Sequence, residues 1–182
     1  MATENVILAG FGGQGLMAIG KILAKAAMEE GKNVTWLPSY GPEMRGGTAN
    51  CVVVIDDEPV GSPVVREPQA AVVMNKQSID KFEATVKQGG WLIVNSSLIE
   101  RKAERKDLKV IYVPANELAE KEGTGKSANM VMLGAYVAAM KTTSAKAVEH
   151  AIEANFAGKK GNVAEVNVNA FRQGYETAKK SL

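Results

Sequence analysis

The sequence predicts an α/β fold: a doubly wound, mostly parallel sheet with a β-hairpin insertion and a helical C-terminal layer. Two observations predict it. Short apolar runs alternate with helical periodicity through the first two thirds of the 182 residues, which is typical of parallel strands joined by crossover helices. From residue 115 onward the periodicity is helical. No linker or repeat divides the chain, so we expect one Rossmann-like domain, residues 1–182.

The N-terminal part predicts a strand, a helix and a second strand. Residues 6–9 form an apolar run that ends at glycines, as in a strand buried on both faces. Residues 16–30 carry apolar side chains at helical spacing, and Gly31 follows where a helix C-cap belongs. A second strand is predicted at residues 34–37. The loop after it, residues 38–47, is long and rich in proline and glycine.

The hairpin is predicted after the third strand, residues 49–55. The sequence Asp-Asp-Glu-Pro at residues 56–59 is typical of a turn, which would lead the chain back toward Val60.

Strands and helices continue to the C-terminus. Ser78 is predicted to cap a helix that runs to about residue 87. Three more buried strands are predicted at residues 70–74, 91–94 and 110–113. The C-terminal helices are predicted near residues 115–122, 127–140, 144–156 and 163–179.

Composition excludes several kinds of site. One Cys and one His cannot form an internal disulfide, a four-thiolate iron–sulfur cluster or a two-His metal centre. A net charge of +2 does not favour nucleic acid binding. The most basic run, residues 100–109, mixes bases with acids, and we interpret it as solvated surface. No segment reaches the length of a membrane span and no charged leader precedes residue 6, so we expect a cytoplasmic protein.

A glycine motif marks the first candidate site. Residues 10–15, Gly-Phe-Gly-Gly-Gln-Gly, match G-x-G-x-x-G between a predicted strand and a predicted helix. Such a turn lets the backbone approach phosphate, and the helix N-terminus supplies free N–H groups. A dinucleotide site would also place an acidic residue at the end of the second strand, and residues 34–39 contain none. We therefore favour the phosphates of another ligand, or an anion; alternatively, the glycines only permit close packing.

The loop at residues 39–47, Ser-Tyr-Gly-Pro-Glu-Met-Arg-Gly-Gly, is the second candidate site. It gathers a hydroxyl, a phenol, a carboxylate and a guanidinium within nine residues. Arg45 beside the amides of Gly46 and Gly47 suits a phosphate or carboxylate. An internal Glu43–Arg45 pair in a rigid loop is the alternative. Long ordered loops are usually functional, so we favour a binding role.

Polar residues elsewhere add candidates. Asn75 and Asn95 follow strand ends, where ligands bind in doubly wound sheets, although both could equally cap turns or helices. Lys126 precedes the helix at residues 127–140 and could hold phosphate there, or be an exposed lysine. We interpret residues 129–136 first as a packed helix, because Met130, Leu133, Gly134 and Val137 fall at core spacing. The methionines of that helix could also form a pliable subunit interface. His150 and Cys51 have no local partner for catalysis, and we interpret both as structural.

Three segments together resemble a known family. Residues 9–15, 39–47 and 129–134 are similar, in the right order, to those of the gamma subunit of 2-oxoacid:ferredoxin (acceptor) oxidoreductases. The likeness covers essentially the whole chain. The Ser-Tyr-Gly-Pro-Glu-x-Arg-Gly-Gly segment is its most specific part.

The resemblance implies a complex that oxidatively decarboxylates a 2-oxoacid, transfers the acyl group to coenzyme A and passes two electrons to ferredoxin. It places thiamine diphosphate and magnesium on alpha and beta subunits, and iron–sulfur clusters on a delta (ferredoxin-like) subunit. This chain would contribute to coenzyme A binding and assembly and would be inactive alone. The motifs do not fix the 2-oxoacid, although 2-oxoglutarate or a branched-chain acid is favoured.

We carry over no catalytic residue and no metal ligand. The candidate coenzyme A contacts are Gly10, Gly12, Gly13, Gln14, Gly15, Ser39, Tyr40, Glu43, Arg45, Gly46, Gly47, Asn75, Lys126 and Asn129. Two other hypotheses remain open: a purely structural interaction module, and a free-standing dinucleotide-binding oxidoreductase. The isolated chain could also form a homodimer. We expect no nucleic acid or membrane partner.

Overall fold

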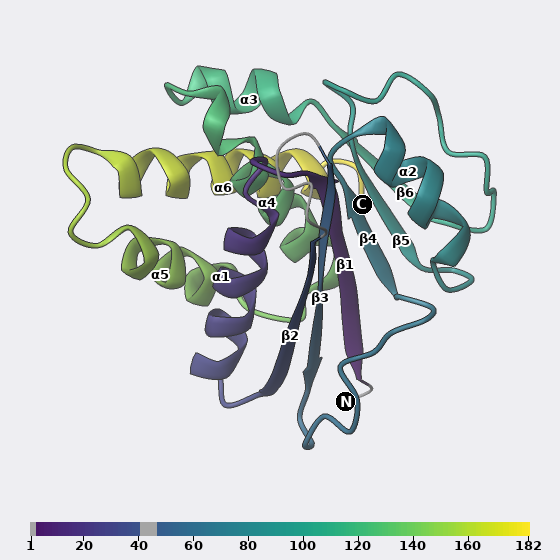
Figure 1. Ribbon diagram of the computed structural model, residues 1–182. Coiled ribbons are helices and arrows are strands. Elements are labelled where there is room, and N and C mark those ends of the chain that lie inside the picture. Colours follow the sequence, from purple (N-terminus) through teal and green to yellow (C-terminus); the bar gives the residue numbers. More distant parts are fainter. Residues whose placement is uncertain (1–2, 41–46) are drawn as a thin grey trace.

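The computed structural model describes residues 3–40 and 47–182, and among them six strands form one sheet. The order across the sheet is β2-β3-β1-β4-β5-β6 (Figure 1). β3 is antiparallel to both of its neighbours, while β1, β4, β5 and β6 pair in parallel. The predicted α/β class with a mostly parallel sheet is confirmed. The strands are β1 (Glu4–Phe11), β2 (Asn33–Tyr40), β3 (Thr48–Asp56), β4 (Ala70–Val73), β5 (Trp91–Asn95) and β6 (Lys109–Val113).

The predicted position of the hairpin is wrong. β3 pairs with the preceding strand β2, from Asn33 opposite Asp56 to Tyr40 opposite Ala49. Its other edge pairs with β1. Because both edges of β3 are already hydrogen-bonded, the chain after Asp56 has no edge of this strand left to pair with. The described residues 57–69 accordingly contain no strand.

Helices cover both faces of the sheet. Figure 1 shows α1, α4, α5 and α6 on one side, α2 on the other, and α3 beyond the carboxyl ends of the strands. The α-helices are α1 (Leu16–Glu29), α2 (Lys76–Phe82), α3 (Ala115–Lys121), α4 (Ala128–Met140), α5 (Ala145–Phe156) and α6 (Val163–Lys179), with 3-10 turns at Glu83–Thr85 and Gly125–Ser127. None of the helices in the described part of the chain is both long and apolar enough to span a membrane.

The helix after β4 differs from the prediction in its cap and its length. The Ser78 backbone N–H donates to Asn75 Oδ1 at 2.8 Å, so Asn75 is the N-cap and Ser78 lies inside the helix. The α-helix ends at Phe82, and a 3-10 turn follows it. Asn75 and not Ser78 is the N-cap because the Asn75 side-chain oxygen accepts a hydrogen bond from a free backbone N–H of the first turn.

α4 is the centre of the helical layer. Its residues 128–138 are all buried, and Met130 and Met132 are at most 1% exposed. α6 packs against it at backbone contact: a Cβ atom on Gly134 would lie 2.0 Å from the Phe171 carbonyl oxygen, and one on Gly174 would lie 1.8 Å from that of Val131. The prediction of a packed core helix is confirmed, and the alternative of a methionine-rich subunit interface is wrong, because Met130 and Met132 fill the chain's own core.

The charged run at residues 100–109 is mostly the solvated surface that we predicted, and only Arg101 and Arg105 among its charged residues are partly buried. It folds around Glu83, whose side chain is 6% exposed. Arg101 Nη1 donates to Glu83 Oε2 at 2.8 Å, and the backbone N–H groups of Glu104 and Arg105 donate to Oε1 at 2.5 and 2.9 Å. Burial alone would raise the pKa of Glu83, but these hydrogen bonds outweigh it and lower the pKa. This Glu83 cluster fastens the loop before β6 onto α2.

Candidate functional site

The carboxyl ends of the parallel strands place most candidate residues along one edge of the sheet. The glycine turn follows β1, Asn75 follows β4, and Asn95 ends β5. Ser39 and Tyr40 end β2, opposite Asn50 and Ala49 of β3. Glu43, Arg45 and Gly46 lie outside the described residues, as does the side chain of Tyr40.

The glycine turn is a tight connection between β1 and α1. Gly13 and Gly15 have φ values of +94° and +76°, which strongly favour glycine. A Cβ atom on Gly10 would lie 2.8 Å from Met74 Cβ, so only glycine lets β1 and β4 approach this closely. The first helical bond runs from Ile19 N to the Gly15 carbonyl, which leaves the N–H groups of the preceding first turn outside the helical ladder.

Two hydrogen bonds fix the shape of this turn. The Gln14 side chain folds back, and its Oε1 accepts from the Phe11 backbone N–H at 2.6 Å. Gly12 N donates to the Gly47 carbonyl at 3.0 Å, which joins the turn to the start of β3. Because the Gln14 Oε1 atom accepts this hydrogen bond, the Nε2 group of the same amide faces away from the turn.

Asn129 ties the glycine turn to α4. Its Nδ2 donates to the Gly15 carbonyl at 3.1 Å, and its Oδ1 accepts from the Met130 backbone N–H at 2.9 Å. A Cβ atom on Gly15 would lie 2.3 Å from this Nδ2. Asn129 therefore fastens two segments that are 114 residues apart in the sequence.

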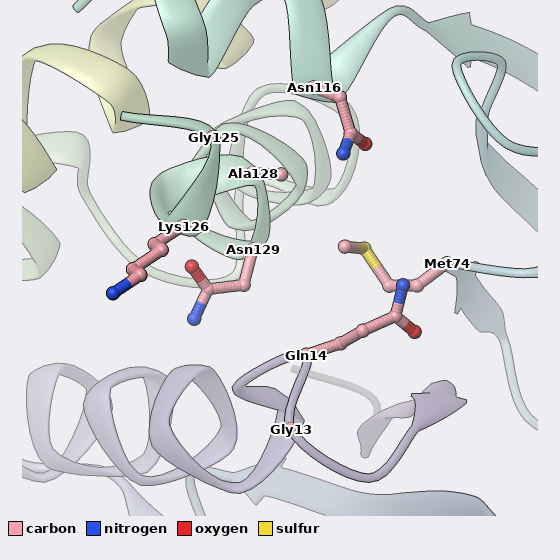
Figure 2. A pocket seen from close by; sticks show the side chains of 8 residues that line it. All are labelled: Gly13, Gln14, Met74, Asn116, Gly125, Lys126, Ala128 and Asn129. Atoms are coloured by element: carbon pink, nitrogen blue, oxygen red, sulfur yellow. The ribbon is translucent and has the colours of Figure 1, made fainter. Parts of the chain in front are cut away.

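A cavity of about 310 Å³ lies between the glycine turn and the start of α4. Figure 2 shows Gln14 reaching up from the turn toward Met74, with Asn116 on the opposite side and Asn129 and Lys126 beside α4. Among the described residues, its lining contains amides and one lysine but no carboxylate. The lining residues are Gly13, Gln14, Met74, Asn116, Gly125, Lys126, Ala128 and Asn129.

Lys126 lines the cavity from a structured turn, and Figure 2 shows its side chain extending past Asn129, away from Gln14 and Asn116. The Thr124 hydroxyl accepts from the Lys126 backbone N–H at 3.2 Å. The next residue, Ser127, donates through Oγ to Asn167 Oδ1 at 3.1 Å, which anchors the turn to α6. The backbone is thus held while the lysine side chain stays exposed.

Asn116 is a lining residue that our sequence analysis missed. It lies in the first turn of α3, directly after β6, and its Oδ1 accepts from Asn95 Nδ2 at 3.0 Å. Asn95 is fully buried and does not itself line the cavity. The signal that could have found Asn116 is its place after the end of another parallel strand.

A second cavity, of about 480 Å³, lies on the other side of the same turn. Its lining is mainly apolar and includes Phe11, Leu16 and Trp36. Lys21 Nζ lies 4.9 Å from the centre of the Trp36 ring, a cation–π contact. The two cavities share Gly13, so the glycine turn separates a polar compartment from an aromatic one.

Three candidate or reactive residues have structural positions. Asn75 is 2% exposed and caps α2 rather than lining either cavity. Burial raises the pKa of the Cys51 thiol to about 12, and its Sγ faces the Leu16 carbonyl at 3.5 Å. His150 is exposed, and its Nδ1 forms a hydrogen bond with Glu29 Oε2 at 3.0 Å.

Within residues 3–40 and 47–182 no three His, Cys, Asp or Glu side chains are grouped so that they could hold a metal.

The sequence of residues 5–177 matches the family model of pyruvate ferredoxin/flavodoxin oxidoreductases. The chain belongs to this family. The match spans the glycine turn, both cavities and all of α4, so the site described above lies within the family's common part.

Known proteins of the oxidoreductase family resemble the chain over nearly all of its residues. The ketoisovalerate oxidoreductase subunit VorA of Methanothermobacter marburgensis is 40% identical over 179 residues, which are 98% of this chain and 37% of that subunit. The chain thus spans little more than a third of the VorA length. The solved gamma subunit of a keto/oxoacid ferredoxin oxidoreductase from Geobacter sulfurreducens superposes with a TM-score of 0.88 and 32% identity, covering 100% of this chain and 99% of that one.

A larger solved structure has the same fold. The 2-oxoglutarate:ferredoxin oxidoreductase of Magnetococcus marinus, which was solved with 2-oxoglutarate, coenzyme A and succinyl-CoA bound, matches with a TM-score of 0.91. The match covers 99% of this chain and 32% of that chain, at 21% identity. At this identity the likeness establishes a shared fold.

Proposed function

We propose that this chain is the gamma subunit of a 2-oxoacid:ferredoxin oxidoreductase and that it holds the phosphates of coenzyme A. The observation that carries the proposal is the polar cavity beside the glycine turn, which gathers the Gln14 and Asn116 amides and Lys126 around about 310 Å³. Family membership and the end-to-end likeness to the Geobacter gamma subunit support the role as a subunit.

The polar cavity has the chemistry that phosphates require. Amide N–H groups and an ammonium are donors to phosphate oxygens, and none of the lining residues that the structure describes is a carboxylate that would repel them. The N-terminus of α1, a helix of 14 residues, adds a partial positive charge beside the same turn. The diphosphate of coenzyme A would therefore gain attraction from three sides.

The apolar cavity suits the rest of the same ligand. Its aromatic lining, with Phe11 and Trp36, can contact the adenine ring or the pantetheine arm. Lys21, which lies over Trp36, would be within the same compartment as an additional cation. We therefore assign the phosphates to the first cavity and an uncharged part of coenzyme A to the second.

Partner chains would carry out the chemistry. In the proposed complex a 2-oxoacid loses CO2, its acyl group is transferred to the coenzyme A thiol, and two electrons pass to ferredoxin. One Cys and one His supply too few ligands for a cluster, so we assign the clusters to a delta subunit. The resemblance to the gamma subunits implies that alpha and beta subunits hold thiamine diphosphate and Mg²⁺. The residues of this chain bind and orient coenzyme A, in the cytoplasm, and take no part in bond making.

The alpha and beta subunits, and not this chain, determine which 2-oxoacid the proposed complex uses. The relatives are named for ketoisovalerate, for 2-oxoglutarate and for pyruvate together with ketoisovalerate. Among these acids we favour a branched-chain acid or 2-oxoglutarate. Co-expression with the neighbouring genes and comparison of the 2-oxoacids as substrates gives the assignment.

Lys126→Ala tests the coenzyme A site. Loss of a charged donor costs about 1.5–3 kcal/mol, so we expect coenzyme A to bind about tenfold to a hundredfold more weakly. Calorimetry on the assembled complex measures this, with the 2-oxoacid as an internal reference whose affinity stays unchanged. Lys146→Ala, an exposed lysine on α5, is the matched control. Equal coenzyme A affinity for wild type and Lys126→Ala would contradict the assignment.

Arg45→Ala and Tyr40→Ala separate this proposal from a purely structural role. If the loop at residues 39–47 only held partner chains, either change would dissociate the complex. The coenzyme A role predicts an intact complex with a raised KM for coenzyme A. Size-exclusion chromatography and initial-rate kinetics on the same preparations distinguish the two results.

A further inference from the structure

We propose that Asn95 is a positioning residue, which fixes the Asn116 amide so that its nitrogen and not its oxygen faces the polar cavity. The inference rests on the proposed function, because it concerns how the same cavity selects an anion. Asn95 is fully buried behind the cavity, at the end of β5, and it does not touch the cavity itself.

The orientation of Asn95 is set by the backbone around it. Its Oδ1 accepts from the Ser97 N–H at 3.2 Å and from the Ala115 N–H at 3.3 Å. An Asn95 amide turned the other way would bring its NH2 group against these two donors. Its Nδ2 must therefore point at Asn116, where it donates to Oδ1 at 3.0 Å.

The orientation of Asn116 follows from that of Asn95. Asn116 could present either end of its amide to the cavity, but its oxygen already accepts the bond from Asn95. Its NH2 group is left for the cavity, and it has no acceptor within the described residues. The backbone beneath is held as well, because Asn116 N donates to Ser97 Oγ at 3.0 Å.

Gln14, on the opposite side of the cavity, is oriented in the same way as Asn116, by an internal hydrogen bond to its amide oxygen. Its Oε1 is occupied by the Phe11 backbone N–H at 2.6 Å, which leaves Nε2 toward Met74 and Asn116 (Figure 2). Both amides are thus locked as donors before a ligand arrives. A cavity with preset donors attracts phosphate oxygens.

Asn95→Asp tests the inference with a change of one atom. The carboxylate still accepts from the Ser97 and Ala115 N–H groups, but it has no proton for the Asn116 oxygen. Asn116 must then turn and donate to the new carboxylate, which brings its oxygen to the cavity. We expect coenzyme A to bind at least tenfold more weakly to the assembled complex, with the KM for the 2-oxoacid unchanged.

A double-mutant cycle separates positioning from the added charge. In an Asn116→Ala background there is no amide to turn, so adding Asn95→Asp is expected to change coenzyme A affinity less than threefold. An equal loss in both backgrounds would mean that charge or misfolding, and not the Asn116 amide, causes the effect, and would overturn the inference. Asn5→Asp, an amide-to-acid change on β1 that pairs with Gln69 far from the site, is the control.

Asn116→Asp is a second variant that does not depend on a buried charge, because this residue is half-buried at the cavity wall. Its Oδ1 keeps the bond from Asn95 while its second oxygen faces the ligand, so it is expected to weaken coenzyme A binding more than Asn116→Ala does. Equal losses would overturn the inference. If the wild-type complex binds no coenzyme A, both the proposed function and this inference are wrong. If Lys126→Ala weakens coenzyme A binding and Asn95→Asp does not, the proposed function stands and only this inference is wrong.

Discussion

The Glu83 cluster and the polar cavity are both built from polar side chains, and they differ in what remains after internal hydrogen bonds are formed. The Glu83 carboxylate accepts one guanidinium and two backbone N–H groups, and its side chain is 6% exposed. In the cavity, Gln14 and Asn116 each use their oxygen internally and keep an NH2 group without an acceptor in the described part of the chain. The first arrangement is closed, and the second is open to a ligand.

The difference separates stability from binding. A buried carboxylate that has all its hydrogen-bond partners is compatible with a stable fold, and removing one of these groups lowers the free energy of unfolding strongly. Donors left at a cavity wall contribute little to the fold, because water can satisfy them, but they bind an incoming anion. The two regions should therefore respond to mutation in opposite ways.

Glu83→Ala is expected to have the largest effect, and on stability. It leaves Arg101 and two backbone N–H groups without their acceptor, which we expect to cost about 3 kcal/mol of unfolding free energy. Urea unfolding followed by circular dichroism measures it. Coenzyme A affinity of the folded fraction should be unchanged, and a matching loss of affinity would mean that the two regions are coupled.

Gln14→Glu is expected to have the next largest effect, and on binding. Glutamate keeps the oxygen that accepts from Phe11 N, but it replaces the cavity-facing NH2 group by a second oxygen that repels phosphate. We expect coenzyme A affinity to fall about a hundredfold and the unfolding free energy to change by less than about 0.5 kcal/mol. Gln173→Glu, on the outer surface of α6, is a matched control. If Gln14→Glu lowered the unfolding free energy and left coenzyme A affinity unchanged, Gln14 would serve stability and not binding, which would contradict this prediction.

The pH dependence of unfolding should give the smallest effect. The pKa of Glu83 in the folded chain is lowered below its ordinary value of 4.5, so the unfolded chain binds the proton more readily. The stability that ionised Glu83 contributes is therefore complete above pH 4.5 and is lost as the pH falls through the lowered value. Glu83→Gln should flatten this slope in urea unfolding between pH 5 and pH 3, whereas Glu67→Gln, at an exposed position, should leave it as in wild type.

Local patterns in the sequence predicted the parts of the site that depend on local geometry. The glycine turn was predictable because positive φ and close strand contact both demand glycine between a strand and a helix. The strand-end positions of Asn75 and Asn95 followed from apolar runs, and capping was one of their two expected roles. The helices of the C-terminal part agree with their predicted ranges to within a residue or so.

Contacts between distant segments could not be predicted in this way. The contacts of Arg101 and of the Glu104 and Arg105 backbone N–H groups could not be predicted, because their acceptor Glu83 lies about 20 positions earlier and no local pattern marks it as buried. Asn116 acquires its orientation from Asn95, 21 residues away. The hairpin was misplaced because the turn-like residues 56–59 follow a strand whose two edges were already paired.

A crystal structure of the assembled complex with coenzyme A tests the central claim most directly. We predict that the diphosphate lies between Gln14 Nε2, Asn116 Nδ2 and Lys126 Nζ, with N···O distances near 2.8–3.0 Å, as in other charge-assisted hydrogen bonds. Coenzyme A bound with its phosphates away from this cavity, or an Asn116 oxygen facing the phosphate, would contradict the account.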